Sequence, residues 1–336
     1  MGYSYRFELI NVPDKVKEKM PPPIALFVSS CYNFLIGSPC RTGGNVKKRK
    51  TLQDLTIKDN FLFGAVMSVE DNCREFLEMV LGFPIARVVV SREKSIVYHP
   101  EYKGVRLDLY AEDENHTHYN VEMQVKKKAA LGKRSRYYHS QMVMEALESG
   151  EDYETLPDTF VIFICDFDPF DRKLYCYTFR NECREDKNVK LGDGSCTIFL
   201  STRGENEEAV PPELVRFLKF VTADLKESEG DFQDRLVSQL QKTIRDIKTD
   251  REMGERYMTL EELLKDEKQE GRLEATRENI LELLEELGPV PDQLRDQLEE
   301  LEELGDLRAL LKLAAKADSL DVFEKGAEKY LQSSQS

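Results

Sequence analysis

A continuous apolar run, Thr159-Phe-Val-Ile-Phe-Ile-Cys165, is the feature that most constrains how this chain folds. It has the length of a strand and shows no alternation of apolar and polar residues. Both faces of such a strand must therefore be covered by other elements. The preceding segment, Lys133–Ser149, has apolar residues at helical spacing, and Gly150 ends it. A buried strand that follows a crossover helix indicates an α/β core.

Further elements are expected on both sides of this unit. Helices are predicted over about 59–69 and 71–81, where apolar residues recur at helical spacing before Gly82 and Pro84. Segments rich in β-branched and aromatic residues predict strands over Ala86–Ser91, Val105–Ala111, His118–Val125 and Leu174–Phe179. Only the polar turn Glu112–Thr117 separates the second and third of these strands, so we expect a hairpin. The pattern predicts a mixed sheet with helices on both sides, over residues 51–225.

The two flanks of this core differ from it in composition. Residues 1–50 contain Pro21-Pro22-Pro23 and several glycines, so we expect a poorly ordered N-terminal extension. Residues 226–336 have leucines three or four apart among charged residues, which predicts an all-α C-terminal tail. Gly288-Pro289-Val290-Pro291 interrupts the tail, which favours a small helical bundle or a hairpin over one long coiled coil.

The charge of the chain is unevenly distributed. The net charge is −15, of which residues 231–336 carry −11 and residues 1–230 only −4. Residues 47–136 carry 17 basic and 13 acidic side chains, so a locally basic face can attract phosphate. We expect no membrane span, because no apolar run approaches about 20 residues. The odd number of cysteines, 7, without any CxxC pair favours a reducing cytoplasm over disulfides or zinc.

Two carboxylates and an amide are placed to act together. Glu122 and Gln124 are two residues apart on one predicted strand, so they share a face, while Met123 points the other way. Asp108 lies on the partner strand of the hairpin and can join them. Two neighbouring carboxylates repel each other and attract a cation, and oxygen ligands suit Mg²⁺ or Mn²⁺. From spacing alone, the alternative is an ordinary pair of acidic residues that face solvent.

Several segments resemble the PD-(D/E)XK nuclease superfamily and, more narrowly, the Rpn-type recombination-promoting nucleases and transposases. The resemblance extends over roughly residues 51–225 and includes the helix that contains Arg136-Tyr137-Tyr138. The segments that carry it are Thr56-Ile-Lys-Asp59-Asn-Phe-Leu-Phe63, Arg106-x-Asp108, Val121-Glu-Met-Gln124, Gly150-x-x-Tyr153, the strand 159–165 and Phe167-x-x-Phe170.

The resemblance implies a restriction-endonuclease-like core, a divalent metal ion held by Asp108 and Glu122, and hydrolysis of DNA linked to recombination. It also implies that the backbone carbonyl of Met123 is a metal ligand. Gln124 occupies a position where the superfamily most often has lysine, although glutamine is the Rpn-type variant. Glutamine can orient a water molecule or a phosphate, but it cannot bring a positive charge to the nucleophile.

Other residues are candidates with a structural alternative beside each. Asp59 is a further candidate metal ligand, or a helix N-terminal carboxylate that meets the helix dipole. Arg106 and Arg136 are candidates for DNA contact, or members of structural ion pairs. Lys126, Lys127 and Lys128 are candidate contacts to the DNA backbone, or a solvated loop. The histidines, His99, His116, His118 and His139, are expected at the surface rather than in a zinc site.

Three functional hypotheses follow from these residues. The first is a cytoplasmic, Mg²⁺-dependent DNA endonuclease in which Asp108, Glu122 and Gln124 carry the chemistry. The second is an inactive nuclease-fold module that binds DNA or protein and assembles as a homo-oligomer through its C-terminal helices. The third is an acidic scaffold without a nucleic-acid partner, against which the basic residues at 126–136 speak.

Overall fold

The computed structural model describes residues 50–92, 95–96, 105–146 and 152–334. The chain divides into two compact units, one formed by Asn45–Met258 and the other containing Thr259–Ser336. The predicted N-terminal extension lies outside the described residues, apart from Lys50. The segment boundary that the sequence suggests at residue 225 stays a prediction.

A mixed sheet of six strands forms the centre of the first unit, in the order β1-β4-β5-β6-β8-β7. Strands β5, β6 and β8 are parallel, and the other neighbours are antiparallel. The strands are β1 (Val88–Arg92), β4 (Leu109–Asp113), β5 (His118–Gln124), β6 (Thr159–Cys165), β7 (Cys176–Phe179) and β8 (Ser195–Ser201). A separate ladder pairs β2 (Ser95–Ile96) with β3 (Val105–Arg106). The predicted mixed sheet is confirmed.

Most predicted strands are found, with two differences. The buried strand β6 has the predicted bounds, and all of its residues are buried. The strand predicted over Val105–Ala111 is broken at Leu107 and Asp108, because β3 pairs with β2 whereas β4 pairs with β1 and β5. Strand β8 had no sequence prediction, and it separates β6 from β7 in the sheet.

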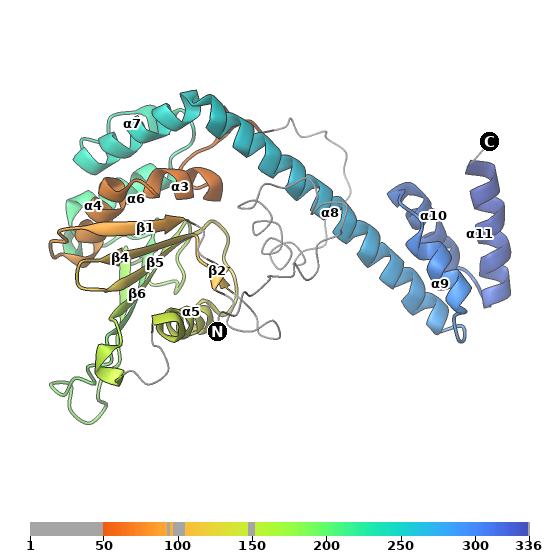
Figure 1. Ribbon diagram of the computed structural model, residues 1–336, viewed down its shortest axis with the longest axis horizontal. Helices are drawn as coiled ribbons and strands as arrows, with labels where there is room; N and C mark the ends of the chain where they lie inside the picture. Colours follow the sequence, from red (N-terminus) through yellow and green to blue (C-terminus); the bar gives the residue numbers. More distant parts are fainter. Residues whose placement is uncertain (1–49, 93–94, 97–104, 147–151, 335–336) are drawn as a thin grey trace, which may run out of the picture. The chain divides into compact units, whose positions relative to one another are not determined.

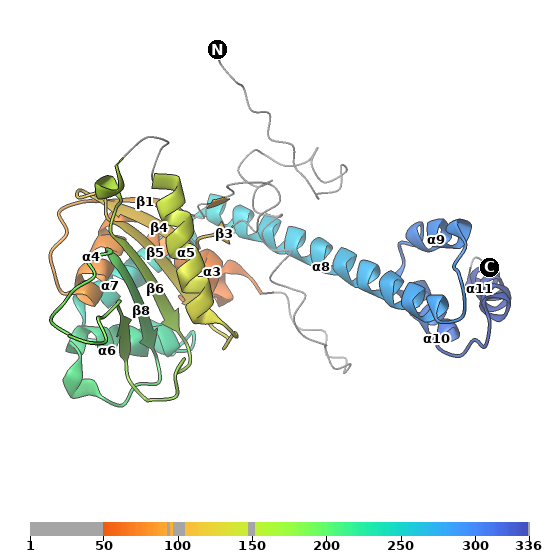
Figure 2. The same cartoon turned by 90° about the horizontal axis from the view of Figure 1, so that it is seen from below.

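Helices cover both faces of this sheet (Figure 1). Helix α5 (Leu131–Ala146) lies on one face, as the view from below in Figure 2 shows. The opposite face carries α3 (Asn60–Met67), α4 (Glu70–Leu81), α6 (Pro212–Thr222) and α7 (Arg235–Thr249). Helices α3 and α4 confirm the two helices predicted before Gly82. Short 3₁₀ turns occur at Leu52–Asp54, Tyr153–Thr155, Glu207–Ala209 and Glu227–Glu229.

The hydrophobic core occupies both spaces between sheet and helices. On the face of α3, α4 and α6, the rings of Phe76 and Phe217 lie 5.2 Å apart. On the face of α5, Phe163 stacks on Phe199 at 4.9 Å and packs near Tyr138. Apolar residues of the two predicted helices and of the predicted buried strand are buried: Phe61, Phe63, Phe76, Val161, Phe163 and Cys165.

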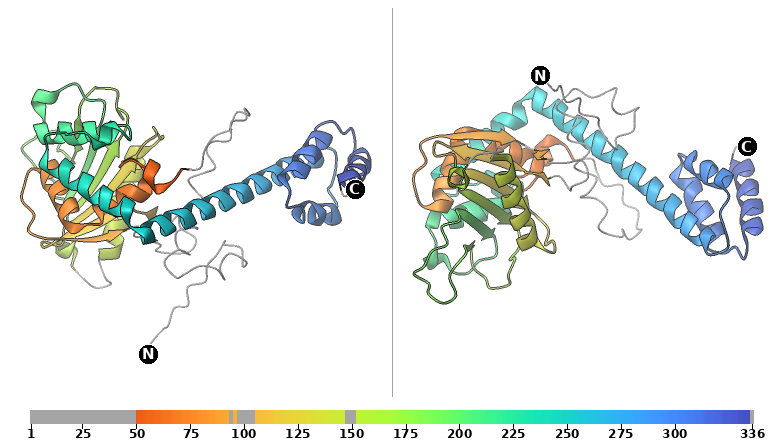
Figure 3. Two further views of the ribbon diagram at one scale, coloured as in Figure 1. Left: turned by 90° about the horizontal axis from the view of Figure 1, so that it is seen from above. Right: turned by 60° about the horizontal axis from the view of Figure 1, so that its bottom comes forward.

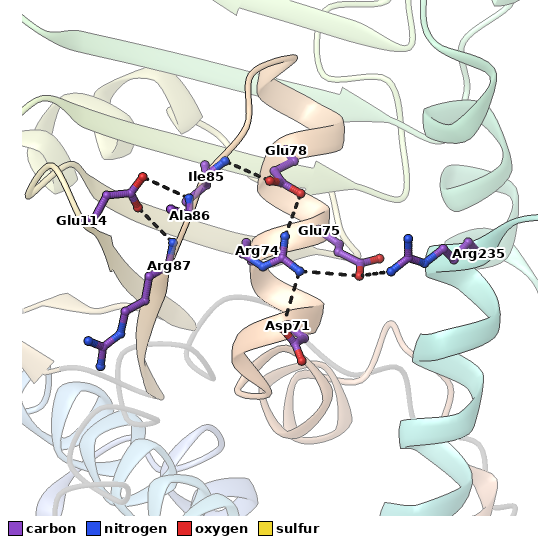
Figure 4. A network of polar contacts seen from close by, with 9 residues as sticks. All are labelled: Asp71, Arg74, Glu75, Glu78, Ile85, Ala86, Arg87, Glu114 and Arg235. Atoms are coloured by element: carbon purple, nitrogen blue, oxygen red, sulfur yellow. Dashed lines mark hydrogen bonds and ion pairs between the residues drawn. The ribbon is translucent and has the colours of Figure 1, made fainter.

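Charged side chains fix α4 to its neighbours (Figure 4). Arg74 pairs with Glu78 on the next turn at 3.1 Å and lies 3.8 Å from Glu75. Glu75 in turn pairs with Arg235 at the start of α7 at 3.0 Å. Glu78 accepts a hydrogen bond from the backbone N–H of Ile85 at 2.9 Å. The chain that enters β1 is thereby held against α4.

The described part of the second unit is helical, as predicted. Helix α8 (Arg251–Glu285) continues into it from the first unit and is followed by α9 (Asp292–Glu299), α10 (Leu304–Ala314) and α11 (Leu320–Ser334) (Figure 3). Leucines of α8 to α10, together with Phe323 of α11, form one buried cluster. The interruption predicted at 288–291 is confirmed between α8 and α9. None of the helices within the described ranges has the length and apolar content that crossing a membrane requires.

Candidate active site

The acidic pair, Asp108 and Glu122, is brought together by the pairing of β4 and β5. The register Leu109↔Val121 places Asp108, just before β4, opposite Glu122. Glu122 Oε1 accepts a hydrogen bond from the N–H of Asp108 at 3.3 Å, and Asp108 Oδ2 accepts one from the N–H of Met123 at 3.2 Å. Each carboxylate is therefore held by the backbone of the opposite segment.

Burial makes the acidic pair electrostatically unusual. The Glu122 side chain is only 2% exposed. Loss of contact with water raises the pKa of Glu122 well above its usual range, and the neighbouring Asp108 carboxylate raises it further. Arg134 acts in the opposite direction but does not cancel these effects. The ionised form of Glu122 is therefore destabilised at this site in spite of its contact with Arg134.

Gln124 and two residues of α5 complete the site. Glu122 lies beside Phe163 in the parallel register of β5 and β6, which places it and Gln124 on the sheet face that α5 covers. Arg134 Nη1 donates to Gln124 Oε1 at 3.2 Å, and its Nη2 donates to Glu122 Oε2 at 3.3 Å. The Tyr138 hydroxyl donates to Glu122 Oε2 at 3.4 Å. Arg134 was not among the residues singled out from the sequence, although its spacing to Tyr138 places both on one helix face.

The donor atoms of this site suit a hard divalent cation. Within the described ranges, no group of three or more histidine, cysteine, aspartate or glutamate side chains could hold a metal ion. Mg²⁺, however, is commonly held by one or two carboxylates and keeps several waters. The acidic pair, in which the buried Glu122 carboxylate lies beside that of Asp108, fits that requirement. The role predicted for the Met123 carbonyl stays a prediction; the Met123 side chain is 2% exposed and packs in the core.

Asp59 caps a helix. It is the N-cap residue of α3, and its side chain accepts a hydrogen bond from the N–H of Phe61 at 3.1 Å. This geometry is the structural alternative that the sequence left open for Asp59. A second role as a metal ligand stays a prediction.

The predicted DNA-binding residues occupy different environments. Lys126 and Lys127 are exposed after β5, and Lys127 pairs with Asp171 at 2.8 Å. Lys128 is half-buried, and burial together with the charge of Arg134 lowers the pKa of its amine to about 8. The carboxylates of the acidic pair counteract that shift, so Lys128 lies within their electrostatic reach.

The structure gives less support for the two arginines that were predicted to contact DNA. Arg136 is exposed on α5, and its carbonyl oxygen accepts a hydrogen bond from Ser140 Oγ at 3.0 Å. The backbone of Arg106 belongs to β3, but its side chain lies outside the described part of the structure. Arg134, two residues before the arginine that the sequence suggested, contacts Glu122 of the acidic pair directly.

The expectation of surface histidines is wrong for His118, and His139 is only partly exposed. His118 is 8% exposed. His139 Nδ1 lies 2.7 Å from Thr159 Oγ1 and its Nε2 lies 2.9 Å from Thr197 Oγ1, and that hydroxyl lies 2.5 Å from Ser135 Oγ. We call these four residues of α5, β6 and β8 the His139 network. Burial lowers the pKa of His139 to about 4, which keeps the ring neutral.

Comparison with known proteins identifies the family of this chain. Residues 57–272 match the model of a family described as PD-(D/E)XK nuclease family transposase. The match includes the acidic pair and Gln124, and it agrees with the restriction-endonuclease-like fold that the sequence predicted. No curated protein and no solved structure matches the chain.

Proposed function

The chain belongs to the PD-(D/E)XK nuclease family of transposases, and on this premise we propose that it is a metal-dependent DNA endonuclease that acts in recombination or transposition. The observation that carries the proposal is the acidic pair: the Glu122 side chain is buried, and the neighbouring charge of Asp108 destabilises its ionised form more than Arg134 stabilises it. Such a pair costs stability in a folded protein unless a cation compensates it, which favours a functional role.

The residues of the site have separate roles in this proposal. Asp108 and Glu122 would hold Mg²⁺ or Mn²⁺, which supplies a polarised phosphate oxygen and a bound water with a lowered pKa. Gln124 orients the attacking water or the phosphate through its amide N–H groups, because its Oε1 atom already accepts from Arg134. Tyr138 fixes the orientation of Glu122 through its hydroxyl.

DNA binding is proposed for the basic residues that follow the site. Lys126, Lys127 and Lys128 come directly after β5, and Arg136 is exposed on the neighbouring helix. Lysines of this kind contact phosphates without reading the sequence, so binding should weaken steeply with salt. We also propose a cytoplasmic location, which the free thiols of the described cysteines favour.

The experiment that tests the proposal is cleavage of supercoiled plasmid by the purified protein with Mg²⁺, with Mn²⁺ and with EDTA. Nicking should require the metal ion and should be lost in Glu122→Ala. Glu112→Ala is the matched control, because this carboxylate of β4 pairs with His116 at 2.6 Å instead of with the acidic pair. Metal-independent nicking, or equal activity of Glu122→Ala and wild type, would contradict the proposal.

A nuclease-fold module that binds DNA or protein without cleaving it is the second candidate. One observation favours it: Gln124 brings no positive charge to the strand that carries the acidic pair. In this version the helices of the second unit, with their own buried leucine cluster, assemble copies of the chain. DNA binding that is insensitive to metal, without cleavage, by a protein that light scattering shows to be oligomeric would favour this candidate over the first.

A further inference from the structure

We propose that Arg134 is the cationic group of this site: it neutralises Glu122 in the metal-free protein, competes with a divalent cation for that carboxylate, and contacts a non-bridging oxygen of the substrate phosphate. The inference rests on the proposed nuclease function and adds a residue to it. Its basis is the contact set of one side chain on α5, which touches both functional residues of β5.

The guanidinium of Arg134 is shared between an amide and a carboxylate. Its Nη1 donates to Gln124 Oε1 at 3.2 Å and its Nη2 donates to Glu122 Oε2 at 3.3 Å. Two acceptors two residues apart on one strand match the planar fork of arginine, which lysine lacks. A glutamine at 124 can accept from Arg134, whereas a lysine there would repel it. Gln124 and Arg134 therefore form a unit in which the helix supplies the charge that the strand does not.

Aromatic groups hold the guanidinium in place. The Tyr138 hydroxyl accepts from Nη2 of Arg134 at 2.5 Å. The guanidinium carbon lies 5.4 Å from the centre of the Tyr138 ring and 6.0 Å from that of Phe163. Contacts of this kind orient a cation without neutralising it. The charge of Arg134 is thus positioned in advance, while its positive character remains available to a ligand.

The Arg134 side chain is more accessible to solvent than Glu122, so a ligand from solution can reach it. The Arg134 side chain is 30% exposed, whereas Glu122 behind it is 2% exposed. The guanidinium therefore lies between the buried carboxylate and solvent, from which DNA approaches. Arginine binds phosphate oxygens through the same paired N–H groups that bind a carboxylate.

The charges of these groups agree with a change of partners, in which Glu122 binds the metal ion and Arg134 binds the phosphate. With both carboxylates of the acidic pair ionised, these two groups and Arg134 together carry a net charge of −1. A divalent cation changes this excess to one positive charge, which matches a single phosphodiester. Glu122 cannot satisfy a close cation and Arg134 equally well, so binding of the ion weakens the hold of Glu122 on the arginine.

The test compares Arg134→Gln and Arg134→Lys with wild type, and uses Arg180→Gln as the matched control, because Arg180 is an exposed arginine directly after β7, at the edge of the same sheet. The first measurement is Mn²⁺ binding by the DNA-free protein, followed by calorimetry at pH 8. Arg134→Gln should bind Mn²⁺ several-fold more tightly than wild type, because a competing cation is removed. Arg134→Lys and Arg180→Gln should bind it as wild type does.

The second measurement is the rate of plasmid cleavage at saturating metal. We expect kcat to fall about a hundredfold in Arg134→Gln, with KM changed much less, as for the loss of one transition-state donor. Arg134→Lys should recover part of the rate, since it keeps the charge but not the fork. Arg180→Gln should leave kcat unchanged.

Two outcomes would overturn the inference. If Arg134→Gln weakens Mn²⁺ binding and lowers the unfolding temperature, Arg134 is a structural partner of Glu122. If kcat is unchanged in both Arg134 variants, the arginine does not reach the substrate. Absence of cleavage by folded wild-type protein would instead count against the nuclease proposal, and the Mn²⁺ measurement would still decide whether Arg134 competes with a metal ion.

Discussion

Helix α5 covers two polar groups, the acidic pair and the His139 network. Only in the acidic pair does a neighbouring like charge destabilise the ionised form of a buried side chain. Arg134 and Tyr138 face the acidic pair, while Ser135 and His139, each one residue further along, face the threonines of the His139 network. Both ring nitrogens of His139 lie within hydrogen-bond distance of a hydroxyl, and no partner in the network is charged. Glu122, in contrast, lies beside another carboxylate.

The contrast separates a structural polar group from a functional one. Burial moves the pKa of both groups toward the neutral form, down for His139 and up for Glu122. The two differ in their further causes. The charge of Asp108 destabilises the ionised form of Glu122, whereas His139 contacts neutral hydroxyls and the charge of Asp193 partly offsets the effect of burial. Burial alone therefore does not mark an active site, but burial together with an unbalanced like charge does.

The substitution Asp108→Asn tests this comparison with the largest expected effect. We expect cleavage to fall by about a thousandfold or more, because one of two carboxylates for the metal ion is lost. The free energy of unfolding should not fall, because repulsion of Glu122 is relieved. Plasmid nicking and urea unfolding measure the two effects. A variant that is both inactive and much less stable would place Asp108 with the structural groups.

Gln124→Ala tests whether the amide beside the acidic pair is catalytic. The side chain is 5% exposed and accepts from Arg134. We expect cleavage about a hundredfold slower, on the order of the loss of one transition-state donor. Binding of DNA with Ca²⁺ in place of Mg²⁺ should change far less. Unchanged cleavage would show that Gln124 is not a catalytic residue.

His139→Gln tests the His139 network, which contains no charged partner, through the pH dependence of protein stability. Below pH 6.5, His139 becomes protonated in the unfolded chain, whereas in the folded protein it stays neutral down to about pH 4. The free energy of unfolding therefore falls as the pH falls through this window. Wild type should lose on the order of 2 kcal/mol more than His139→Gln between pH 7 and pH 4.5. Urea titrations of both proteins at the two pH values measure the difference. Equal losses would contradict the burial of this ring.

Asp59→Ala gives the smallest expected effect. Loss of the N-cap of α3 should reduce the free energy of unfolding by about 1 kcal/mol. Cleavage and Mn²⁺ affinity should stay at the wild-type level. If Mn²⁺ affinity drops instead, Asp59 belongs to the metal site as well as to the helix end, and the acidic group is larger than the pair.

Local sequence was enough to predict much of this protein. Period and composition predicted α3, α4 and β6, and the alternation along β5 placed Glu122 and Gln124 on one face with Met123 behind them. The short polar turn predicted that Asp108 joins them. These features depend on residues that are near in the chain, where geometry leaves few choices.

Only the tertiary structure decided which other groups meet the acidic pair. Strand β8 inserts between β6 and β7, and the break before Asp108 depends on which strand each half pairs with. The rotation of α5 on the sheet turns Arg134 toward Glu122, leaves Arg136 exposed and buries His139 on two threonines. Spacing shows which residues of a helix share a face. Packing of the whole helix against the sheet determines which face is buried.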